Sequence, residues 1–533
     1  METVVVGERS LSQEDVVAVA RHGARVGIAT GVMQRLVRDR SVVDDVVDRG
    51  VPAYGVTTGL GSRATYALPR EELSAFSLRT VRGRANAVGD PLPTEVVRAA
   101  ILARVNGMAF GGSGVQPGVF ELLVGMLNAG VHPVVPETGS IGASDLNQMA
   151  HVGLVVAGEG RAELRGETID GATALRRADL APLALGPKDG LVLCGASPIA
   201  AGAGALVASD ASVARDMAQA VAALTYEGFR ANTSPLDPRA QRARSAPCQA
   251  DAAGDLLELL AGGELPDPRA ARRVQDPISV RCVAQVHASL YSALSFLADA
   301  LLPELNGTGD NPLVFAETGE ILSTGNFHTP GLALAFDTLA LALCQTAALA
   351  SARIQCLLAP GVSGLPANLS PHGPERSGLA PLAKTAQALV TEIRHLATPV
   401  STDPRQGADA VEDDSTNAAY GARRLATILA RSRHVLAVEA VAAAQAVHLA
   451  RPPRLGRGPG MLLDAVRDVV APLDDDRPCG HDAERVAHDV IGSGELHERI
   501  RTTLIASPTT RGPETCSPSG SRTSTDPMSP SWR

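Results

Sequence analysis

One stretch of the chain combines residue types that suit chemistry at the start of a helix. Residues 133–160 read PVVPETGSIGASDLNQMAHVGLVVAGEG, in which a turn of small residues leads to Asp145 and then to an apolar helical run. Small residues let the backbone bend tightly and let other groups approach it. The free amides and the dipole of a helix N-terminus favour negative charge, so this loop could hold an anion or an electrophile. The alternative is a loop that only caps a helix, since Ser and Asp are ordinary capping residues.

A phenol and a guanidinium upstream of this stretch are further candidates for chemistry. Tyr54 lies in PAYGVTTGLGSRA (52–64), a Gly- and Thr-rich segment that could be a mobile lid carrying one phenol or a turn around a packed Tyr. Arg84 could offer two parallel donors, which suit a carboxylate or another anionic group better than an aromatic ring. A lone Arg on a helix is usually solvated, as Arg79 and Arg82 would be, so a surface role for Arg84 is the alternative.

Two charged residues in the second half of the chain are candidates for binding small charged groups. Arg281 follows the Pro-terminated turn of RVQDPISVRCVAQVHASL (273–290), from which a fork of donors can face a cleft and bind a carboxylate. A structural salt bridge is the alternative for this Arg. Glu392 follows the apolar run 388–390, so we expect a partly buried carboxyl group that is suited to proton exchange with an amine.

Composition and charge narrow the class of protein. The chain has 533 residues, 45% hydrophobic and only 3% aromatic, and its long Ala-rich apolar runs at helical spacing favour an all-α bundle. That length allows two to four domains or one large helical domain. The formal net charge of −9 offers no basic surface for nucleic acid or for an anionic membrane. The seven Cys residues lack metal-ligand spacing, so no metal site is predicted.

The two ends of the sequence carry separate expectations. The segment METVVVGERSLSQEDVV has no basic region followed by an apolar stretch and a cleavage site, and no uncharged run favours a membrane span over a core helix. We therefore expect a soluble, cytoplasmic protein without a membrane partner. Residues 506–533 are rich in Ser, Thr and Pro and have no apolar period, which predicts a disordered tail.

Several long motifs resemble those of the aromatic amino acid ammonia-lyase and aminomutase family. The segment GSIGASDLNQMAH (139–151) is similar to GSVGASGDLAPLAH in histidine, phenylalanine and tyrosine ammonia-lyases. YGVTTGLG (54–61) is similar to YGVNTGFG, and VQDPISVRCVAQVH (274–287) to VQDPYSLRCxPQVH. ELNGTGDNPLVF (304–315) is similar to ELNAATDNPLVF, and GNFH follows in both. The resemblance covers residues 50–505 and keeps the order of the motifs.

The resemblance implies a mainly α fold of the ammonia-lyase type. A globular N-terminal domain, residues 1–190, would carry the lid and the prosthetic-group loop, and a long antiparallel helical bundle would follow over residues 191–505. A homotetramer is also implied, with sites that combine residues of several subunits and bind a small amino acid substrate. The wide apolar faces of the Ala- and Leu-rich helices after residue 190 favour such contacts between subunits.

The resemblance also gives roles to individual residues. The family's prosthetic group is methylidene-imidazolone (MIO), an electrophile that an Ala-Ser-Gly segment forms by cyclising on itself, and in this chain it would form from Ala143, Ser144 and Asp145. The matching positions make Tyr54 the base near the substrate β-carbon and Arg281 the clamp on the substrate carboxylate. The remaining substrate contacts would be Asn311, Glu392, Phe327 and Arg84, the last at the position that selects the side chain.

This chain departs from the family pattern at positions that matter for chemistry. It is one residue short in the prosthetic-group loop, so Asp145 follows Ser144 where the family has Gly and then Asp. Cys194 or Gly195 replaces an Asn close to the prosthetic group, and Ile278 replaces a second active-site Tyr. A side chain that ends in methyl groups can neither donate nor transfer a proton.

We predict an ammonia-lyase that converts an amino acid into ammonia and an α,β-unsaturated acid. The β-proton is barely acidic, so this reaction needs an electrophile that makes the amine a leaving group and a base held in place. Ring closure is predicted because Ala143 and Ser144 lie in an otherwise matching loop, although Asp145 brings a β-carbon that Gly lacks. The alternatives are a 2,3-aminomutase, which returns the amine at the β-carbon, and a member without MIO that binds ligand or performs altered chemistry.

Overall fold

The chain folds into two compact units, each assembled from separated stretches of sequence. The computed structural model describes residues 3–403 and 412–505. Unit 1 consists of Met1–Ser209, Ala300–Asp337 and Pro399–Ala426, and unit 2 of Asp210–Asp299, Thr338–Thr398 and Thr427–Arg533. The predicted division at residue 190 stays a prediction, and the tail predicted over 506–533 lies outside the described residues.

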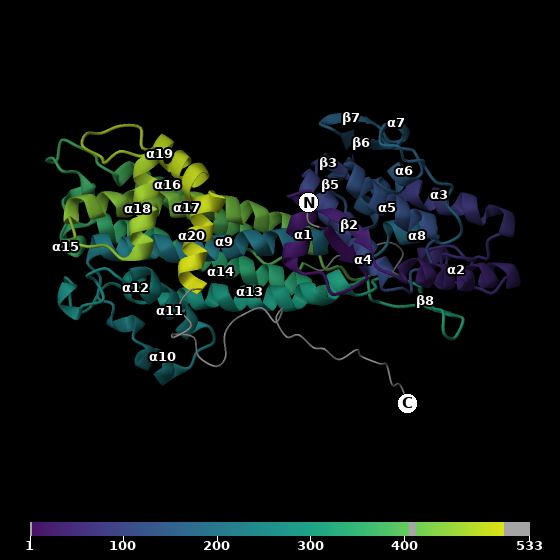
Figure 1. Cartoon of the computed structure of the whole chain (residues 1–533), viewed down its shortest axis with the longest axis horizontal. Helices are drawn as coiled ribbons and strands as arrows, with labels where there is room; N and C mark the ends of the chain where they lie inside the picture. Colours follow the sequence, from purple (N-terminus) through teal and green to yellow (C-terminus); the bar gives the residue numbers. More distant parts are fainter. Residues whose placement is uncertain (1–2, 404–411, 506–533) are drawn as a thin grey trace. The chain divides into compact units, whose positions relative to one another are not determined.

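Helices make up most of the described chain, so the predicted mainly α fold is confirmed (Figure 1). The α-helices are α1 (Gln13–Ala20), α2 (Val32–Arg49), α3 (Leu73–Arg84), α4 (Thr94–Ala109), α5 (Pro117–Ala129), α6 (Leu146–Val156), α7 (Gly171–Arg177), α8 (Asp189–Cys194), α9 (Pro198–Phe229), α10 (Pro238–Arg244), α11 (Gln249–Leu260), α12 (Ile278–Arg281), α13 (Val283–Asn306), α14 (Pro330–Leu358), α15 (Pro360–Ser363), α16 (Ala380–Leu396), α17 (Ala418–Ala450), α18 (Arg457–Val469), α19 (Gly480–Arg485) and α20 (Gly494–Ile505).

The strands of the described chain are short and all belong to unit 1. β1 (Thr3–Val6) pairs in parallel with β2 (Arg25–Ile28). The other pairs are antiparallel: β3 (Val88–Pro91) with β5 (Pro136–Thr138), β4 (Val131–Pro133) with β6 (Arg161–Leu164), β6 with β7 (Glu167–Asp170), and β8 (Leu313–Phe315) with β9 (Glu320–Leu322). Because β5 ends at Thr138, its pairing with β3 fixes where the small-residue loop begins.

Helix α4 is the central helix of unit 1 and buries every residue from Val97 to Ala109. Its apolar residues pack on all sides, as expected for a helix inside a core. The buried Arg104 guanidinium donates to the Val192 carbonyl at 2.6 Å and to the Asp310 carboxylate at 2.6 and 3.0 Å. This ion pair ties α4 both to α8 and to the segment that carries Asn311, so it positions two walls of the site described below.

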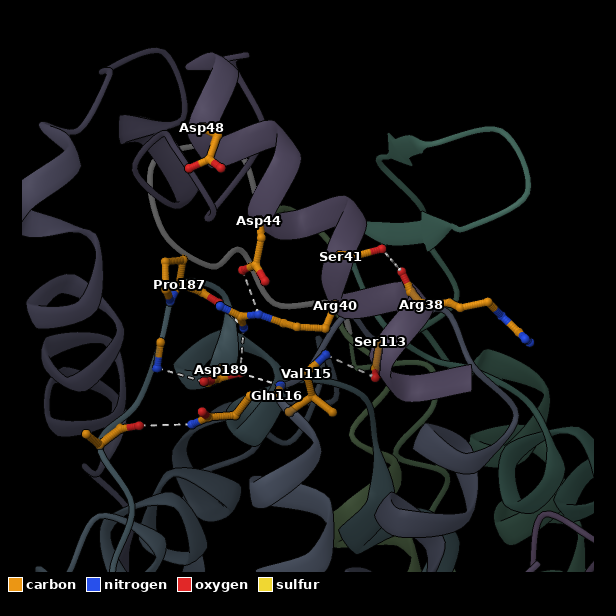
Figure 2. A network of polar contacts seen from close by, with 12 residues as sticks. Arg38, Arg40, Ser41, Asp44, Asp48, Ser113, Val115, Gln116, Pro187 and Asp189 are labelled. Atoms are coloured by element: carbon orange, nitrogen blue, oxygen red, sulfur yellow. Dashed lines mark hydrogen bonds and ion pairs between the residues drawn. The ribbon is translucent and has the colours of Figure 1, made fainter. Parts of the chain in front are cut away.

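A polar network joins α2 to the start of α8 (Figure 2). The buried Asp189 carboxylate accepts the backbone N–H groups of Gly186 at 2.7 Å and Gln116 at 3.0 Å. Arg40 of α2 donates to the Pro187 carbonyl at 3.0 Å and to Asp189 at 3.3 Å. Burial raises the pKa of Asp189 to about 6, against the opposing effect of the Arg40 charge. The network fixes α8, whose C-terminal end leads directly into the site.

Two helical stretches are long and apolar enough, by length and composition, to cross a membrane. They are residues 189–229 and α14, and 89% and 61% of their most apolar windows are buried within the protein. Core helices of soluble proteins pass the same test, so these stretches are weak grounds for a membrane span.

Candidate active site

The small-residue loop of residues 139–145 is clamped from the segment that precedes α17. The Asn417 N–H donates to the Ile141 carbonyl at 2.9 Å, and the Thr416 hydroxyl donates to the Gly142 carbonyl at 3.1 Å. Gly142 has a φ of 84°, and a β-carbon on it would lie 2.0 Å from the Thr416 Oγ1 atom. Only glycine fits this position, because it tolerates positive φ and the close approach of the clamp.

Asp145 anchors the end of the loop to the N-terminus of α9. Its carboxylate accepts the Ser140 hydroxyl at 2.7 Å and the Ala200 N–H at 3.0 Å, and its own N–H donates to the Ala196 carbonyl at 2.8 Å. The residue is fully buried and stands at the N-cap position of α6. A carboxylate at a helix N-terminus satisfies free amides and is favoured by the helix dipole. The anchor therefore joins the loop, α6 and α9.

The Asp145 carboxyl group is costly to ionise despite these partners. Burial raises its pKa to about 6, although the hydrogen bonds from Ser140 and the α9 amides act in the opposite direction. Burial also raises the pKa of the nearby Glu304 to about 7, and the negative charge of Asp145 adds to that shift. Both acids therefore change their proton content near neutral pH, and the charge on Asp145 influences the titration of Glu304.

A cavity of about 260 Å³ opens above the loop in unit 1. Among the residues whose chemistry was predicted to matter, six line it: Tyr54, Arg84, Ala143, Ser144, Asn311 and Phe327. They come from stretches that are far apart in the sequence, and Phe327 is held by the Ser197 hydroxyl, which donates to its carbonyl at 2.8 Å. Gly195 and Ala196, which follow α8, complete the wall next to the loop.

Two polar side chains of the cavity are oriented by local hydrogen bonds. The Gly61 N–H donates to the Tyr54 hydroxyl oxygen at 3.1 Å, a bond that an anionic phenolate oxygen can also accept. The Asn311 amide oxygen accepts the Thr324 N–H at 2.9 Å and the Ser323 hydroxyl at 3.2 Å. Because its oxygen is used in this way, Asn311 presents its NH₂ group as the donor that remains for a ligand.

Charged groups of both signs reach the cavity. Arg84, the last residue of α3, is half-buried, and its positive charge acts on the buried Cys194 thiol, whose pKa burial raises to about 12. Glu412 lines the same cavity. The predictions assigned no role to Glu412, since its place depends on the return of the chain after α16 and not on any local spacing.

Arg281 and Glu392, which were predicted to bind the substrate, do not line this cavity. Both belong to unit 2. Arg281 ends α12, and its buried Nε atom has no hydrogen-bond partner in the part of the chain that the structure describes. An unpaired buried guanidinium nitrogen is costly, which leaves Arg281 suited to an anion.

The expected partial burial of Glu392 is wrong. Its side chain is 54% exposed and forms an ion pair with Arg431. The buried face of α16 includes Ala386 and Ile393, which are seven residues apart and therefore almost aligned along the helix. Glu392 falls off that stripe, and the short apolar run before it, 388–390, is itself only partly buried or exposed.

The residues at 143–145 do not fit the prosthetic group that the resemblance implies. Ring closure requires the nitrogen of residue 145 to attack the carbonyl carbon of residue 143. Ser144 suits a compressed loop, since its φ is 64°. Asp145 does not, because its N–H donates to Ala196 and its carboxyl group is fixed at the start of α9. Ring closure would break the first bond and strain the second, so we assign no step of the reaction to that group.

A family model described as "Aromatic amino acid lyase" matches residues 11–468 of the chain. Histidine ammonia-lyase from Symbiobacterium thermophilum is 40% identical over 497 residues, which cover 93% of this chain and 98% of that protein. Histidine ammonia-lyase from Treponema denticola is 38% identical over 502 residues, covering 94% and 99%.

Solved structures of related enzymes share the fold over nearly the whole chain. Tyrosine aminomutase from Streptomyces globisporus has a TM-score of 0.88 at 31% identity, covering 94% of this chain and 99% of that one. Ergothionase from Treponema denticola, described as an ergothioneine-degrading enzyme, has a TM-score of 0.88 at 28% identity, covering 95% and 100%.

Replacing Asp145 by Asn should change how stability depends on pH. The folded-state pKa of Asp145 lies above its unfolded value, so its contribution to stability is fully present below about pH 4 and is lost as the pH rises through about 6. The wild type should therefore lose up to about 3 kcal/mol more than Asp145→Asn between pH 4 and pH 8. Denaturant unfolding at both values measures this difference. Parallel pH profiles would show that Asp145 does not titrate in this range.

Proposed function

Because this chain belongs to the aromatic amino acid lyase and aminomutase family and is a carbon–nitrogen lyase, we propose that it eliminates ammonia from an amino acid bound in the cavity of unit 1. The observation that carries the proposal is the meeting of Tyr54, Asn311 and Arg84 with the loop at 143–144 around one cavity. Such an elimination needs a base, a hydrogen-bond donor to the substrate carboxylate and a contact to the substrate side chain.

Tyr54 is the proposed base. Its oxygen takes the β-proton of the substrate, and the electron pair of the C–H bond forms the double bond of the α,β-unsaturated acid. The Cα–N bond breaks, and its electron pair leaves with ammonia. The hydrogen bond from the Gly61 N–H holds the Tyr54 oxygen in place at the cavity. The family's MIO group, where it is formed, makes the amine a better leaving group.

Asn311 and Glu412 are proposed to hold the two ends of the amino acid. The free NH₂ group of Asn311 suits the substrate carboxylate, which only accepts hydrogen bonds. Glu412 supplies a negative charge for the substrate ammonium. Phe327 contributes apolar surface to the same cavity.

A homotetramer is proposed as the working assembly, because two predicted substrate contacts are absent from the cavity. In the proposed assembly another copy of the chain supplies Arg281 as carboxylate clamp and Glu392 as amine contact. Leu334 and Leu341 of α14 are 52% and 46% exposed and seven residues apart, an apolar stripe that a second helix can cover. We place this assembly in the cytoplasm.

The anchored position of Asp145 supports one alternative, a member of the family that works without the MIO group. Such a protein would act on an amine that leaves without help from an electrophile, or would bind its ligand without turnover. A second alternative is a 2,3-aminomutase, since a tyrosine aminomutase is among the structural relatives. The experiments that follow separate these readings.

An amino acid with an anionic side chain should be the preferred substrate. The half-buried Arg84 pairs with such a group, and the Arg84→Met variant should lower kcat/KM for aspartate or glutamate by about tenfold or more. A coupled assay for ammonia, with histidine, tyrosine and ergothioneine in the same panel, measures the preference. Arg79→Met, an exposed residue of the same helix that pairs with Glu72, is the matched control. A preference for histidine or tyrosine that Arg84→Met leaves unchanged would refute this selectivity.

Replacing Tyr54 by Phe should reduce turnover about 100-fold or more while the substrate still binds. The change keeps the aromatic ring and removes the oxygen that takes the proton. Initial rates give turnover, and a thermal shift with substrate reports binding, because a ligand of the folded state raises the melting temperature. Tyr66→Phe is the control, since that side chain is 68% exposed and does not line the cavity. Normal turnover in Tyr54→Phe would leave Tyr54 with only a packing role.

Inserting a Gly between Ser144 and Asp145 should create the MIO group that we do not expect in the wild-type loop. The added residue has no β-carbon and can supply the attacking nitrogen, while Asp145 keeps its bonds to Ser140 and Ala200. Peptide mapping by mass spectrometry should show a loss of two waters in the insertion variant and none in the wild type. The same insertion with Ser144→Ala is the control, because the serine water cannot then be lost. A wild-type peptide already lighter by two waters would establish that the ring forms with Asp145.

A further inference from the structure

Three side chains of unit 2 lie close together where α17 meets α19 and the helical turn that follows it. His434 lies on α17, Glu484 on α19 and His488 on the π-helical turn Val486–Ile491 that follows α19 (Figure 1). Glu484 and His488 are four residues apart, so the helical path brings them to one face. Short π-helical turns are uncommon and are frequent at functional sites.

The spacing of the three ligand atoms matches that around a small divalent cation. The Glu484 Oε2 atom lies 3.1 Å from His434 Nε2 and 3.7 Å from His488 Nε2, and all three lie within 4.8 Å of one another. Zinc bonds of 2.0–2.2 Å in tetrahedral geometry place neighbouring ligand atoms roughly 3.3–3.6 Å apart. The two imidazole rings stand at 89° to each other and are not stacked.

The proton on His434 gives a second, independent observation. The His434 Nδ1 atom lies 2.9 Å from the Ala430 carbonyl oxygen, and a carbonyl only accepts hydrogen bonds, so Nδ1 carries a proton. In the neutral ring the Nε2 atom then presents a lone pair to the Glu484 carboxylate at 3.1 Å. Two acceptors at this distance repel each other unless a proton or a cation lies between them. A histidine whose other nitrogen donates to a backbone carbonyl is the usual form of a metal ligand.

We propose that His434, Glu484 and His488 form a binding site for a borderline divalent cation such as Zn²⁺, which ties α17 to α19. Two imidazole nitrogens and one carboxylate oxygen suit zinc, cobalt or nickel, whereas calcium and magnesium prefer oxygen ligands alone. Three protein ligands leave one position for water or another ligand. No local spacing in the sequence predicts this site, because His434 is 50 residues from Glu484 in the chain.

The test is titration of the chelator-treated full chain with Co²⁺ and Zn²⁺ after its thiols have been blocked. The wild type should bind one equivalent that His434→Gln and His488→Gln bind about tenfold or more weakly. His481→Gln, which changes an exposed histidine of the same helix α19, should bind as the wild type does. Visible absorption of bound Co²⁺ should show nitrogen and oxygen ligation, and Zn²⁺ should raise the melting temperature of the wild type and of His481→Gln only.

Two results would overturn the site. Binding of the same equivalent with unchanged affinity in His434→Gln and His488→Gln would place the cation elsewhere. No binding by a folded wild type would mean that His434 is an imidazolium in an ordinary ion pair with Glu484. Circular dichroism and gel filtration of each variant show that a loss of binding does not come from unfolding.

Discussion

The site depends on one buried carboxylate at the start of α9. Asp145 binds the Ala200 amide and the Ser140 hydroxyl, and two residues just before α9 make further bonds to the loop and to a second segment. Ala196 accepts the Asp145 N–H, and Ser197 holds the carbonyl of Phe327. A helix N-terminus must find partners for its free amides, and a carboxylate serves best. The loop therefore cannot move without exposing the first turn of α9.

The same anchor explains how the loop accommodates one residue fewer than the family motif GSVGASGDLAPLAH. A deletion can rotate the following helix by about 100° or shorten the loop before it. In this structure α6 begins directly after Asp145 and buries Met149, Val152 and Val156, which share one helical face. Packing of that face and the Asp145 hydrogen bonds fix the helix. The loop is therefore shorter, and the helix keeps its orientation. The missing residue is the glycine whose flexible backbone would make ring closure possible.

Local sequence motifs predicted those site residues whose positions depend on a short stretch of backbone. Tyr54 and Arg84 reach the cavity from segments whose sequence suggested a lid and an anion contact, and Asn311 reaches it from a motif that the family resemblance singled out. Residues whose place depends on long-range packing were missed or misjudged. Glu412 enters the cavity only because the chain returns past the loop before α17, and Glu392 is exposed because neighbouring positions on α16 form the buried stripe. The mainly α fold needed only the periodicity of the Ala- and Leu-rich runs.

The balance of charge around the cavity bears on which amino acid fits it. Arg84 and the Asn311 amide are donors, and Glu412 is the acidic group among the lining residues. An amino acid with an acidic side chain brings two carboxylates and one ammonium, which pair with two donors and one acceptor. A neutral aromatic side chain would leave the Arg84 guanidinium without an anion in a partly desolvated place, which costs free energy. This balance of charge is the physical reason for proposing an acidic substrate for the cavity of unit 1.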